Sequence, residues 1–360
     1  MQTSIVAWIK PFVEKMLEAF DTFQRVCYMI IAVIGVVVNL LAIVVLSRGM
    51  CGLSTCTTRY LVVMAAADVL AVVSAVILRR MHFYFSGTFL DIYPYCNIIF
   101  VLMCTTRDCS VWFTVNFTLD RFVLICCRKL KSRYCSRKTA TVVLSTTGFL
   151  MCLKNAPYYF TSEPRVIIDN VPWFCDIKPS YFTDPGWVEY SRFDKVVVPL
   201  VPFAVILLFN VLTVRHILQA SRVRKALRVQ RKGENCNDPE LESRRRSVVL
   251  LFTISGSFIL LWLTTLVDYL YYNVTGKNPN YYNPYEYIFG QVGYLLQNVS
   301  LCTNTFIYGV TQSKFRQELV SVVKYPVMAV ILFIRKLNNK LTHEWCKSQR
   351  VFALNLKTKH

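Results

Sequence analysis

Seven long apolar segments, separated by short gaps, constrain this chain more than any other feature of its sequence. The segments run approximately over residues 26–46, 60–78, 95–127, 139–159, 193–218, 247–271 and 285–310. About 20 helical residues suffice to cross the hydrocarbon core of a bilayer. The chain is 54% hydrophobic and 17% charged, whereas a soluble domain is nearer to about 45–50% and 25%. We therefore predict an all-α membrane protein, a seven-transmembrane helix bundle with no separate soluble domain.

The formal net charge of +20 is concentrated in alternate gaps between these segments. The gap after the third segment holds Arg128, Lys129, Lys131, Arg133, Arg137 and Lys138, and the gap after the fifth holds Arg222, Arg224, Lys225, Arg228, Arg231, Lys232, Arg244, Arg245 and Arg246. Cytoplasmic loops carry an excess of Lys and Arg, so we expect these gaps and the C-terminus in the cytoplasm and the N-terminus outside. The protein is then a multi-pass protein of the plasma membrane. Basic loops beside anionic lipid account for the charge, so we expect no nucleic-acid partner.

The parts of the chain outside the bundle are short. Residues 1–25 lack the compact apolar region of a cleaved signal peptide, and we expect an extracellular tail there, before the transmembrane domain at 26–310. Residues 311–324 place apolar residues at helical spacing beside a basic face, which predicts a short amphipathic helix on the inner membrane surface. We expect residues 325–360 to be a cytoplasmic tail.

The chain has 14 cysteines, most of which lie inside apolar segments or in basic gaps. A reduced, buried thiol is the expected state for those residues. Cys96 and Cys175 are instead both placed in the predicted outer layer. We therefore expect one disulfide bond, which joins Cys96 to Cys175.

A few polar and aromatic residues interrupt the apolar segments in a fixed order. They are Asn39 in the first segment, Asp68 in the second, Ser110 and Asp120-Arg121-Phe122 in the third, Phe258 and Trp262 in the sixth, and Asn304-Thr305-Phe306-Ile307-Tyr308 in the seventh. Charges inside lipid are costly and usually functional, although any one polar residue could simply pair two helices. The ordered set is far more specific than any single member.

With these motifs the chain resembles the rhodopsin-like (class A) G-protein-coupled receptors over about residues 26–319. Some stretches resemble one subgroup in particular, the orphan receptors responsive to the aromatic amino acids tryptophan and phenylalanine. They are Tyr60–Asp68, Ser110–Val115, Asn155–Phe160 and Asn304–Tyr308, the last without its usual proline. The resemblance implies a receptor that binds an extracellular small-molecule, amino-acid-like or peptide ligand and activates a heterotrimeric G protein, with Gq-type signalling favoured.

The resemblance assigns roles at the cytoplasmic end of the bundle. Arg121 would hold the inactive state through Asp120 and swing to meet the G protein on activation, and Phe122 replaces the usual tyrosine beside it. Asn304 and Tyr308 belong to the motif of the seventh segment, in which Tyr308 would move inward to support the open cytoplasmic face. Such a bundle is bistable, and a ligand biases its equilibrium by differential affinity for the two states.

The resemblance also implies an ion site and a switch in the middle of the bundle. Asp68, with Ser110 and Asn304 nearby, would form a pocket for an allosteric sodium ion that favours the inactive state. Trp262 would be the rotamer toggle beneath the ligand. No other cofactor or metal is expected.

Two positions depart from the family pattern in the helices that move. Thr264 follows the toggle tryptophan by two residues, and Thr305 lies in the motif of the seventh segment. Proline is usual at the first position in the family and common at the second. Since proline is a frequent cause of helix kinks, these two helices lack their usual reason to bend.

Segment three would border the ligand pocket at its outer end. Met103 replaces the aspartate of amine receptors, which argues against a monoamine ligand. Arg107 and Asp108 are adjacent and therefore cannot share one helix face. One hypothesis places Arg107 in the pocket above the toggle tryptophan, where its planar fork would bind a ligand carboxylate. The alternative is structural, with Asp108 paired to Lys195 or Lys154.

The remaining site predictions complete the outer region. The predicted ligand-binding set is Met103, Arg107, Asp108, Lys195, Trp262 and Thr265, with Arg79, Arg80, Asp194 and Asp268 as weaker candidates at the rim. Segment seven contains no lysine, which excludes a retinal-binding opsin. One Asn-x-Ser/Thr sequon, at Asn273, falls in a predicted outer loop and is a candidate glycosylation site.

Other classes of function remain as alternatives. A channel or transporter would use Asp68, Arg107 and Asp108 along a polar path, but the motif at residues 120–122 would then lack a purpose, and no internal repeat is visible. A non-signalling relative of the receptors is a further alternative, because the prolines are lost. We expect no enzyme, since there is no paired Ser/His or metal cluster and none of the four histidines lies mid-membrane.

Overall fold

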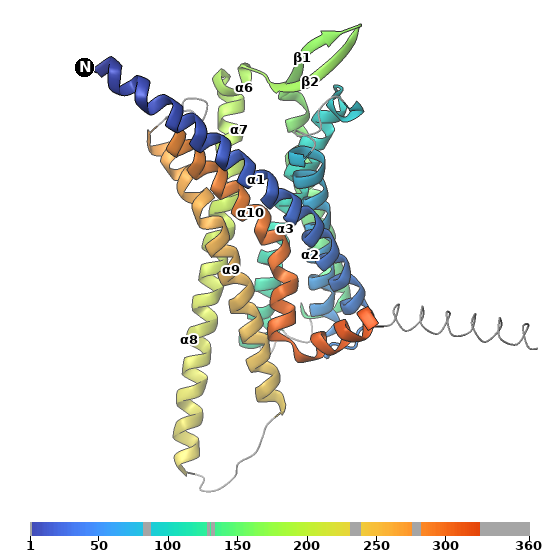
Figure 1. Cartoon of the computed structure of the whole chain (residues 1–360). Helices are drawn as coiled ribbons and strands as arrows, with labels where there is room; N and C mark the ends of the chain where they lie inside the picture. Colours follow the sequence, from blue (N-terminus) through green and yellow to red (C-terminus); the bar gives the residue numbers. More distant parts are fainter. Residues whose placement is uncertain are drawn as a thin grey trace, which may run out of the picture.

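A computed structural model describes residues 2–81, 88–127, 130, 134–230, 239–275 and 282–324. These residues form a bundle of long helices with a small β-hairpin at one end (Figure 1), and the predicted all-α bundle is confirmed. The helices are α1 (Gln2–Ser47), α2 (Thr55–Ala71) continuing into η1 (Val72–Met81), α3 (Tyr95–Cys126), α5 (Arg137–Asn155) continuing into η4 (Ala156–Phe160), α7 (Pro185–Lys195) continuing through η5 (Val196–Leu200) into α8 (Val201–Gln230), α9 (Pro239–Thr275) and α10 (Pro284–Thr311).

Most of these helices are apolar enough to cross a membrane. By length and composition, five stretches of the described residues qualify: Pro11–Ser47, Thr55–Arg80, Tyr95–Cys126, Pro185–Ala220 and Ser247–Tyr271. The helices α5 and α10 were also predicted to span the membrane, but they do not meet this criterion of length and composition. Both are rich in Ser, Thr, Asn or Gln side chains, yet α5 packs on α3, and α10 packs on α9 and α1. In α10, Gln297, Asn304 and Thr305 are buried inside the bundle, whereas the Ser and Thr side chains of α5 are exposed or only partly buried.

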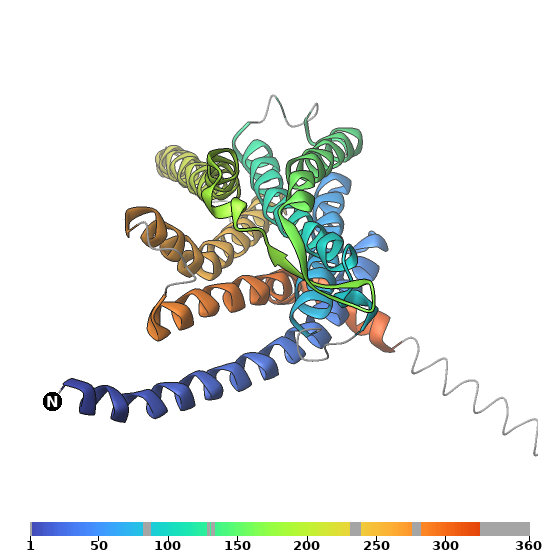
Figure 2. The same cartoon turned by 90° about the horizontal axis from the view of Figure 1, so that it is seen from above.

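The N-terminal residues differ from the expected tail. Helix α1 is continuous from Gln2 and contains Pro11, and in the view from above its first half extends away from the other helices (Figure 2). Residues 14–19 are Glu, Lys, Met, Leu, Glu and Ala, all of which are good helix formers. A salt bridge from Arg25 to Asp21 at 3.9 Å adds support of the (i, i+4) kind. The apolar segment began at residue 26, but the helix does not.

Two of the long helices contain π-helical segments, in which backbone hydrogen bonds join residues five apart in the sequence. In η5 the cause is Pro199, which has no backbone N–H to donate. In η1 the Ser74 Oγ donates to the carbonyl oxygens of Leu70 at 2.8 Å and Ala71 at 3.4 Å. A side chain that competes for the ladder in this way disturbs the regular α-helical pattern. The segment η1 ends with Arg79, Arg80 and Met81.

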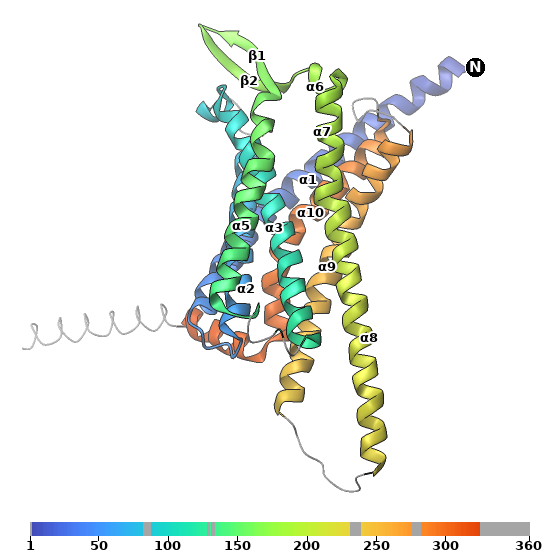
Figure 3. The same cartoon turned by 180° about the vertical axis from the view of Figure 1, so that it is seen from behind.

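A β-hairpin marks one end of the bundle, which we call the hairpin end. Strands β1 (Ser162–Ile168) and β2 (Val171–Ile177) pair antiparallel, and the turn residues Asp169 and Asn170 both have positive φ, as a two-residue type I′ turn requires. Next to it lies the short helix α6 (Ser180–Thr183), above α7 (Figure 3).

The predicted disulfide bond is confirmed. Cys96 in the first turn of α3 is bonded to Cys175 of β2. The single-turn 3-10 helix η3 (Phe89–Asp91) precedes α3, and Ile92 forms an isolated bridge with Trp173. The hairpin is therefore attached to the start of α3 by both a covalent and a backbone link.

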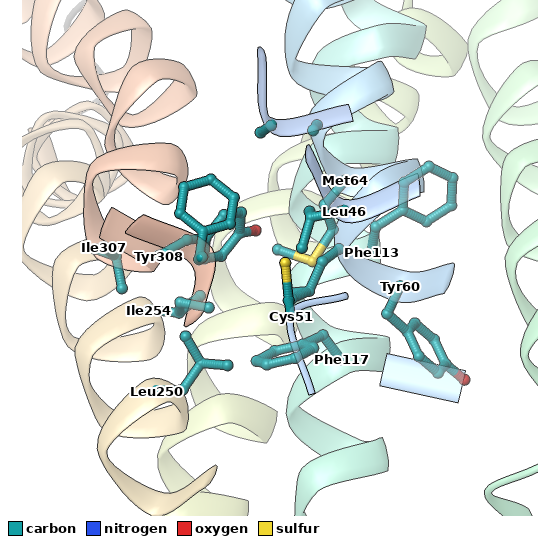
Figure 4. Packing of buried hydrophobic residues seen from close by; sticks show 14 of the residues in the cluster. Leu46, Cys51, Tyr60, Met64, Phe113, Phe117, Leu250, Ile254, Ile307 and Tyr308 are labelled. Atoms are coloured by element: carbon teal, nitrogen blue, oxygen red, sulfur yellow. The ribbon is translucent and has the colours of Figure 1, made fainter. Parts of the chain in front are cut away.

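The main hydrophobic cluster fills the opposite end of the bundle. Figure 4 shows Tyr308 and Ile307 of α10 facing Phe113 and Phe117 of α3, with residues of α1, α2 and α9 around them. After α10, residues 313–324 form the short helix predicted there. Its Phe315 is 1% exposed and its ring lies 5.8 Å from that of Tyr308. This contact anchors the short helix against the bundle.

Candidate functional site

A buried ion pair lies at the end of α3 that is farthest from the hairpin. The Arg121 side chain is 2% exposed and that of Asp120 is fully buried, and Arg121 Nε donates to Asp120 Oδ2 at 3.1 Å. The Arg121 Nη2 donates both to Asp120 and to Thr57 Oγ1, and the guanidinium lies 5.5 Å from the centre of the Phe117 ring. Cys56 donates its thiol hydrogen to Asp120 Oδ1 at 3.1 Å. Arg121 is thus held from several sides.

The neighbours of this ion pair are aromatic. Phe122 packs against Phe209 of α8, with ring centroids 5.0 Å apart, and does not contact Arg121. Tyr308 is 1% exposed, and its hydroxyl has no hydrogen-bond partner among the described residues. Arg316 of the short terminal helix donates to the carbonyl oxygen of Gly309 at 2.9 Å, which satisfies the end of α10.

The middle of the bundle contains a polar network around Asp68. This side chain is fully buried and accepts hydrogen bonds from Ser110 Oγ at 2.5 Å and from Asn304 Nδ2 at 2.9 Å. The structure therefore brings together the three residues of the predicted sodium pocket, from α2, α3 and α10. Nearby, Thr305 Oγ1 donates to Asn39 Oδ1 at 3.1 Å. A proline at position 305 would have no side-chain donor for this bond. Threonine in place of the family's proline therefore adds a contact between α1 and α10.

A small cavity of about 10 Å³ lies beside this network. It is lined by Ser110, Thr114, Ser257, Phe258, Trp262, Ser300, Thr303 and Asn304. This volume suffices for about one water-sized particle, and the lining is rich in hydroxyl oxygens. With a buried carboxylate beside it, such a set of oxygens fits a small, hard cation. Trp262 donates its indole N–H to Ser300 Oγ at 3.1 Å and packs on Phe258 with ring centroids 5.2 Å apart.

At the hairpin end, Asp108 lies in a buried charge network. Lys154 Nζ of α5 is 2.8 Å from Asp108 Oδ2 and also pairs with Asp194 of α7, and Asn155 Nδ2 donates to Asp108 Oδ2 at 2.7 Å. Asp108 is completely buried. The two side chains of α5 occupy Asp108 Oδ2, whereas Oδ1 has no hydrogen-bond partner among the described residues, and a ligand contact of Asp108 stays a prediction. Of the two bases considered as its structural partner, Lys154 is the one in contact.

Arg107 keeps a partly open environment. Its side chain is 26% exposed, and its Nε lies 3.5 Å from Asp108 Oδ1, beyond the usual range for an N–H···O hydrogen bond. The Nε has no hydrogen-bond partner among the described residues. Arg107 does not line the cavity at Trp262. This cavity therefore does not connect Arg107 with Trp262, the two residues that were predicted to contact the ligand.

The other predicted pocket residues have diverse surroundings. Met103 is partly buried on α3. The Lys195 ammonium lies 5.4 Å from the centre of the Tyr269 ring on α9. Thr265 Oγ1 lies 3.0 Å from the point where a Cβ on Gly293 would be, so this threonine fills the close contact between α9 and α10. A ligand contact of Thr265 stays a prediction. Asn273 lies in the last turn of α9, and its side chain is outside the described residues.

Several contacts of the site were missed by sequence reasoning. Thr57 and Cys56 precede the second apolar segment and looked like loop residues, although they lie in the first turns of α2 and hold the Arg121–Asp120 pair. Ser300 carries the bond to Trp262 and resembles any other small residue of a span. Asn155 gave a usable signal, because an amide at the end of an apolar segment needs a buried partner.

Comparisons with known proteins agree with this arrangement. Residues 38–308, well over half of the chain, match the family model described as 7 transmembrane receptor (rhodopsin family). The chain belongs to this family. It is similar to the FMRFamide receptor of Drosophila melanogaster, with 21% identity over 339 residues that cover 86% of this chain and 53% of the relative. The chain thus spans about half the length of that relative. It is a multi-pass membrane receptor of the rhodopsin family and not an enzyme.

Proposed function

We propose that this chain is a G-protein-coupled receptor that binds an extracellular small-molecule or peptide ligand and activates a heterotrimeric G protein, with Gq-type signalling favoured. The observation that carries the proposal is the buried Asp120–Arg121 pair at the end of α3. A buried ion pair is weak evidence for stability as such, and its best attested use is a switch or register role. In a bundle of this family, that use is to hold the inactive state.

The proposed orientation places the hairpin end outside the cell. Disulfide bonds form in oxidising compartments, and the Cys96–Cys175 bond belongs to this end. The basic gaps flank the other end, as cytoplasmic loops do. The N-terminus is then extracellular and the C-terminus cytoplasmic, and the Asp120–Arg121 pair faces the G protein.

The switch works by differential affinity for two states of the bundle. A ligand at the extracellular end favours a state in which Trp262 leaves Ser300 and the cavity beside Asp68 changes shape. Asp68 and the neighbouring hydroxyls would hold a sodium ion here, and its positive charge would stabilise the present arrangement of these residues against that change. At the cytoplasmic end, Arg121 leaves Asp120 and becomes available to the G protein, while Tyr308 moves inward.

The ligand class is proposed from two sources that agree only in part. The name of the Drosophila relative supports a short peptide, and the resemblance to receptors for aromatic amino acids supports a smaller ligand. Arg107 is our candidate to bind a carboxylate of either one, with Met103 and Lys195 beside it and Trp262 below. A carboxylate would give the Arg107 guanidinium the bidentate hydrogen bonds that the 3.5 Å contact to Asp108 does not provide.

A calcium-readout screen of amino acids and short peptides tests the proposal, repeated with the variant Arg107→Met. An active compound should lose its response in this variant while surface expression stays unchanged. The variant Arg107→Lys keeps the charge without the planar fork and should respond weakly. Loss of surface expression in Arg107→Met would instead assign this residue a structural role. A constitutive ionic current from the wild type would favour the channel alternative.

A further inference from the structure

Two adjacent arginines at the hairpin end have no counter-charge among the residues that the structure describes. Arg79 and Arg80 end the membrane-spanning stretch that begins at Thr55. Most other charged side chains at this end are paired: Lys154 with two aspartates, Arg165 with Asp176 and Arg192 with Glu189. Arg79 and Arg80 make no ion pair and no hydrogen bond with any residue that the structure describes.

The two guanidinium groups are held by aromatic rings between helices. Arg79 lies 5.5 Å from the ring centre of Phe100 on α3. Arg80 lies 5.6 Å from Tyr28 on α1 and 5.8 Å from Tyr294 on α10. Since Tyr28 is 1% exposed, Arg80 is directed into the space between helices. A cation–π contact uses the face of a guanidinium, whereas an oxyanion binds its N–H edge, so the edges remain available.

A buried amide one helical turn before Tyr28 also lacks a hydrogen-bond partner among the described residues. Gln24 on α1 is 4% exposed, and its Nε2 is buried without a hydrogen-bond partner among the described residues. Gln24 precedes Tyr28 by four residues, so both side chains lie on one face of α1. The face of α1 that carries Tyr28, whose ring Arg80 contacts, therefore also carries the unsatisfied N–H donor of Gln24. Buried donors without partners are rare in native structures and call for an explanation.

The inner side of this region is closed by an apolar cluster. Tyr28, Ile31, Val76 and Leu295 are all buried there, together with other residues of α1, η1 and α10. Apart from the Tyr28 hydroxyl, these side chains offer no acceptor for the three donors, and two uncompensated guanidinium groups near a membrane are costly. An acceptor that satisfies them must therefore come from the hairpin end.

We propose that Arg79 and Arg80, with Gln24, form a subsite for a carboxylate group of the receptor's ligand. This inference rests on the proposed function, because it assumes an extracellular ligand, and it specifies the chemistry of that ligand. Each guanidinium offers a planar fork that matches a carboxylate, and the rings of Phe100 and Tyr294, which are not buried, suit an apolar group beside it. An amidated peptide, such as the one in the name of the Drosophila relative, has no C-terminal carboxylate and would need an acidic side chain to use this subsite.

The experiment compares two probes that differ by one negative charge. The full-length receptor is placed in phosphatidylcholine nanodiscs, and its thermal unfolding midpoint is titrated with N-acetyl-L-phenylalanine and with N-acetyl-L-phenylalaninamide. The acid should raise the midpoint of the wild type and the amide should not. In Arg79→Gln and Arg80→Gln the apparent affinity for the acid should fall at least about tenfold, as expected for the loss of a charge-assisted hydrogen bond.

Matched variants separate the subsite from general effects of charge and folding. Arg192→Gln removes the same charge from an exposed arginine at the hairpin end and should respond to the acid as the wild type does. Gln24→Leu keeps both arginines and should weaken the response to a smaller extent. An equal response in wild type, Arg79→Gln and Arg80→Gln, or an equal response to acid and amide, would overturn the proposal.

Two further measurements are needed. One identifies the source of the anion, and the other shows whether a negative result concerns the subsite or the proposed signalling function. If phosphate of the lipid headgroup is the natural partner, the acid will act on the wild type in maltoside micelles but not in nanodiscs, and this result contradicts a ligand subsite. G-protein nucleotide exchange by Asp120→Asn is measured in the same preparations. Exchange without acid binding rejects the subsite alone, and acid binding without exchange rejects the proposed signalling function alone.

Discussion

Lys154 places one ammonium group between two carboxylates, Asp108 on α3 and Asp194 on α7. This arrangement joins three helices at a depth where an unpaired charge is expensive. The sequence predicted that Asp108 needs a buried base, but it offered Lys195 and Lys154 equally. The choice depends on the rotation of each helix about its axis, which an apolar segment buried on several sides does not specify.

Replacing Lys154 with Met should destabilise the receptor strongly. The substitution removes the ammonium group that the Asp108 and Asp194 carboxylates share, and breaking a buried pair in this way costs about 3–5 kcal/mol. The unfolding midpoint in detergent and the surface expression should both fall. Lys138→Met on the same helix changes an exposed lysine and serves as the control. Equal midpoints for the two variants would show that the network contributes little.

The Asp68 network leads to a prediction about sodium. If the cavity beside Asp68 holds a sodium ion, exchange of potassium chloride for sodium chloride at constant ionic strength should raise the unfolding midpoint of the wild type. Asp68→Asn removes the carboxylate charge and keeps a side chain of similar shape, so its midpoint should not depend on the cation. A sodium effect of the same size in both proteins would contradict the assignment.

Among the elements, the β1–β2 hairpin and helix α1 differ most from expectation. The hairpin has a local signal that was not used, the Asp169-Asn170 pair between the β-branched residues 166–168 and Val171, which suits a turn with two positive φ angles. The length of α1 could not be inferred from hydropathy, because its first 25 residues continue the helix by propensity and not by apolar character. The segments α5 and α10 were found because their apolar residues still recur along the chain.

The hairpin carries an exposed ion pair that predicts its pH dependence. Arg165 donates to both carboxylate oxygens of Asp176, at 2.8 and 2.9 Å, and these bonds lower the pKa of Asp176. A carboxyl group whose pKa is lowered in the folded state stabilises it above the unfolded pKa of about 3.9 and loses that effect as the pH falls through the folded value. Since both side chains are exposed, the effect should stay below about 1 kcal/mol.

Hydrogen exchange of the hairpin amides checks this prediction. After correction for intrinsic exchange, the protection of β1 and β2 should fall between about pH 5 and pH 3 in the wild type. Asp176→Asn should show the lower protection at both values. The disulfide Cys96–Cys175 keeps the hairpin attached in each case. A wild-type protection that does not change with pH would mean that the ion pair does not contribute.

For the whole molecule, the sequence predicted the bundle and its family but not the ligand region. The bundle follows from apolar segments long enough to span a membrane, and the family follows from motifs at fixed places within them. The ligand-binding set stays a prediction, and two of its members, Asp108 and Thr265, also make contacts between helices. Burial inside a bundle and exposure to a pocket have the same appearance in sequence, since both require a polar residue in an apolar segment.

The central claim is that Arg121, once released from Asp120, activates a G protein, and it can be tested without knowledge of the ligand. The variant Asp120→Asn removes the charge that holds Arg121 while keeping a side chain of the same shape. In nanodiscs with purified Gq, Gi and Gs heterotrimers, this variant should raise basal nucleotide exchange roughly fivefold over the wild type, the equivalent of about 1 kcal/mol. Adding Arg121→Ala should abolish the increase. Exchange by Asp120→Asn no faster than with receptor-free nanodiscs, for all three G proteins and with the unfolding midpoint preserved, would contradict the account.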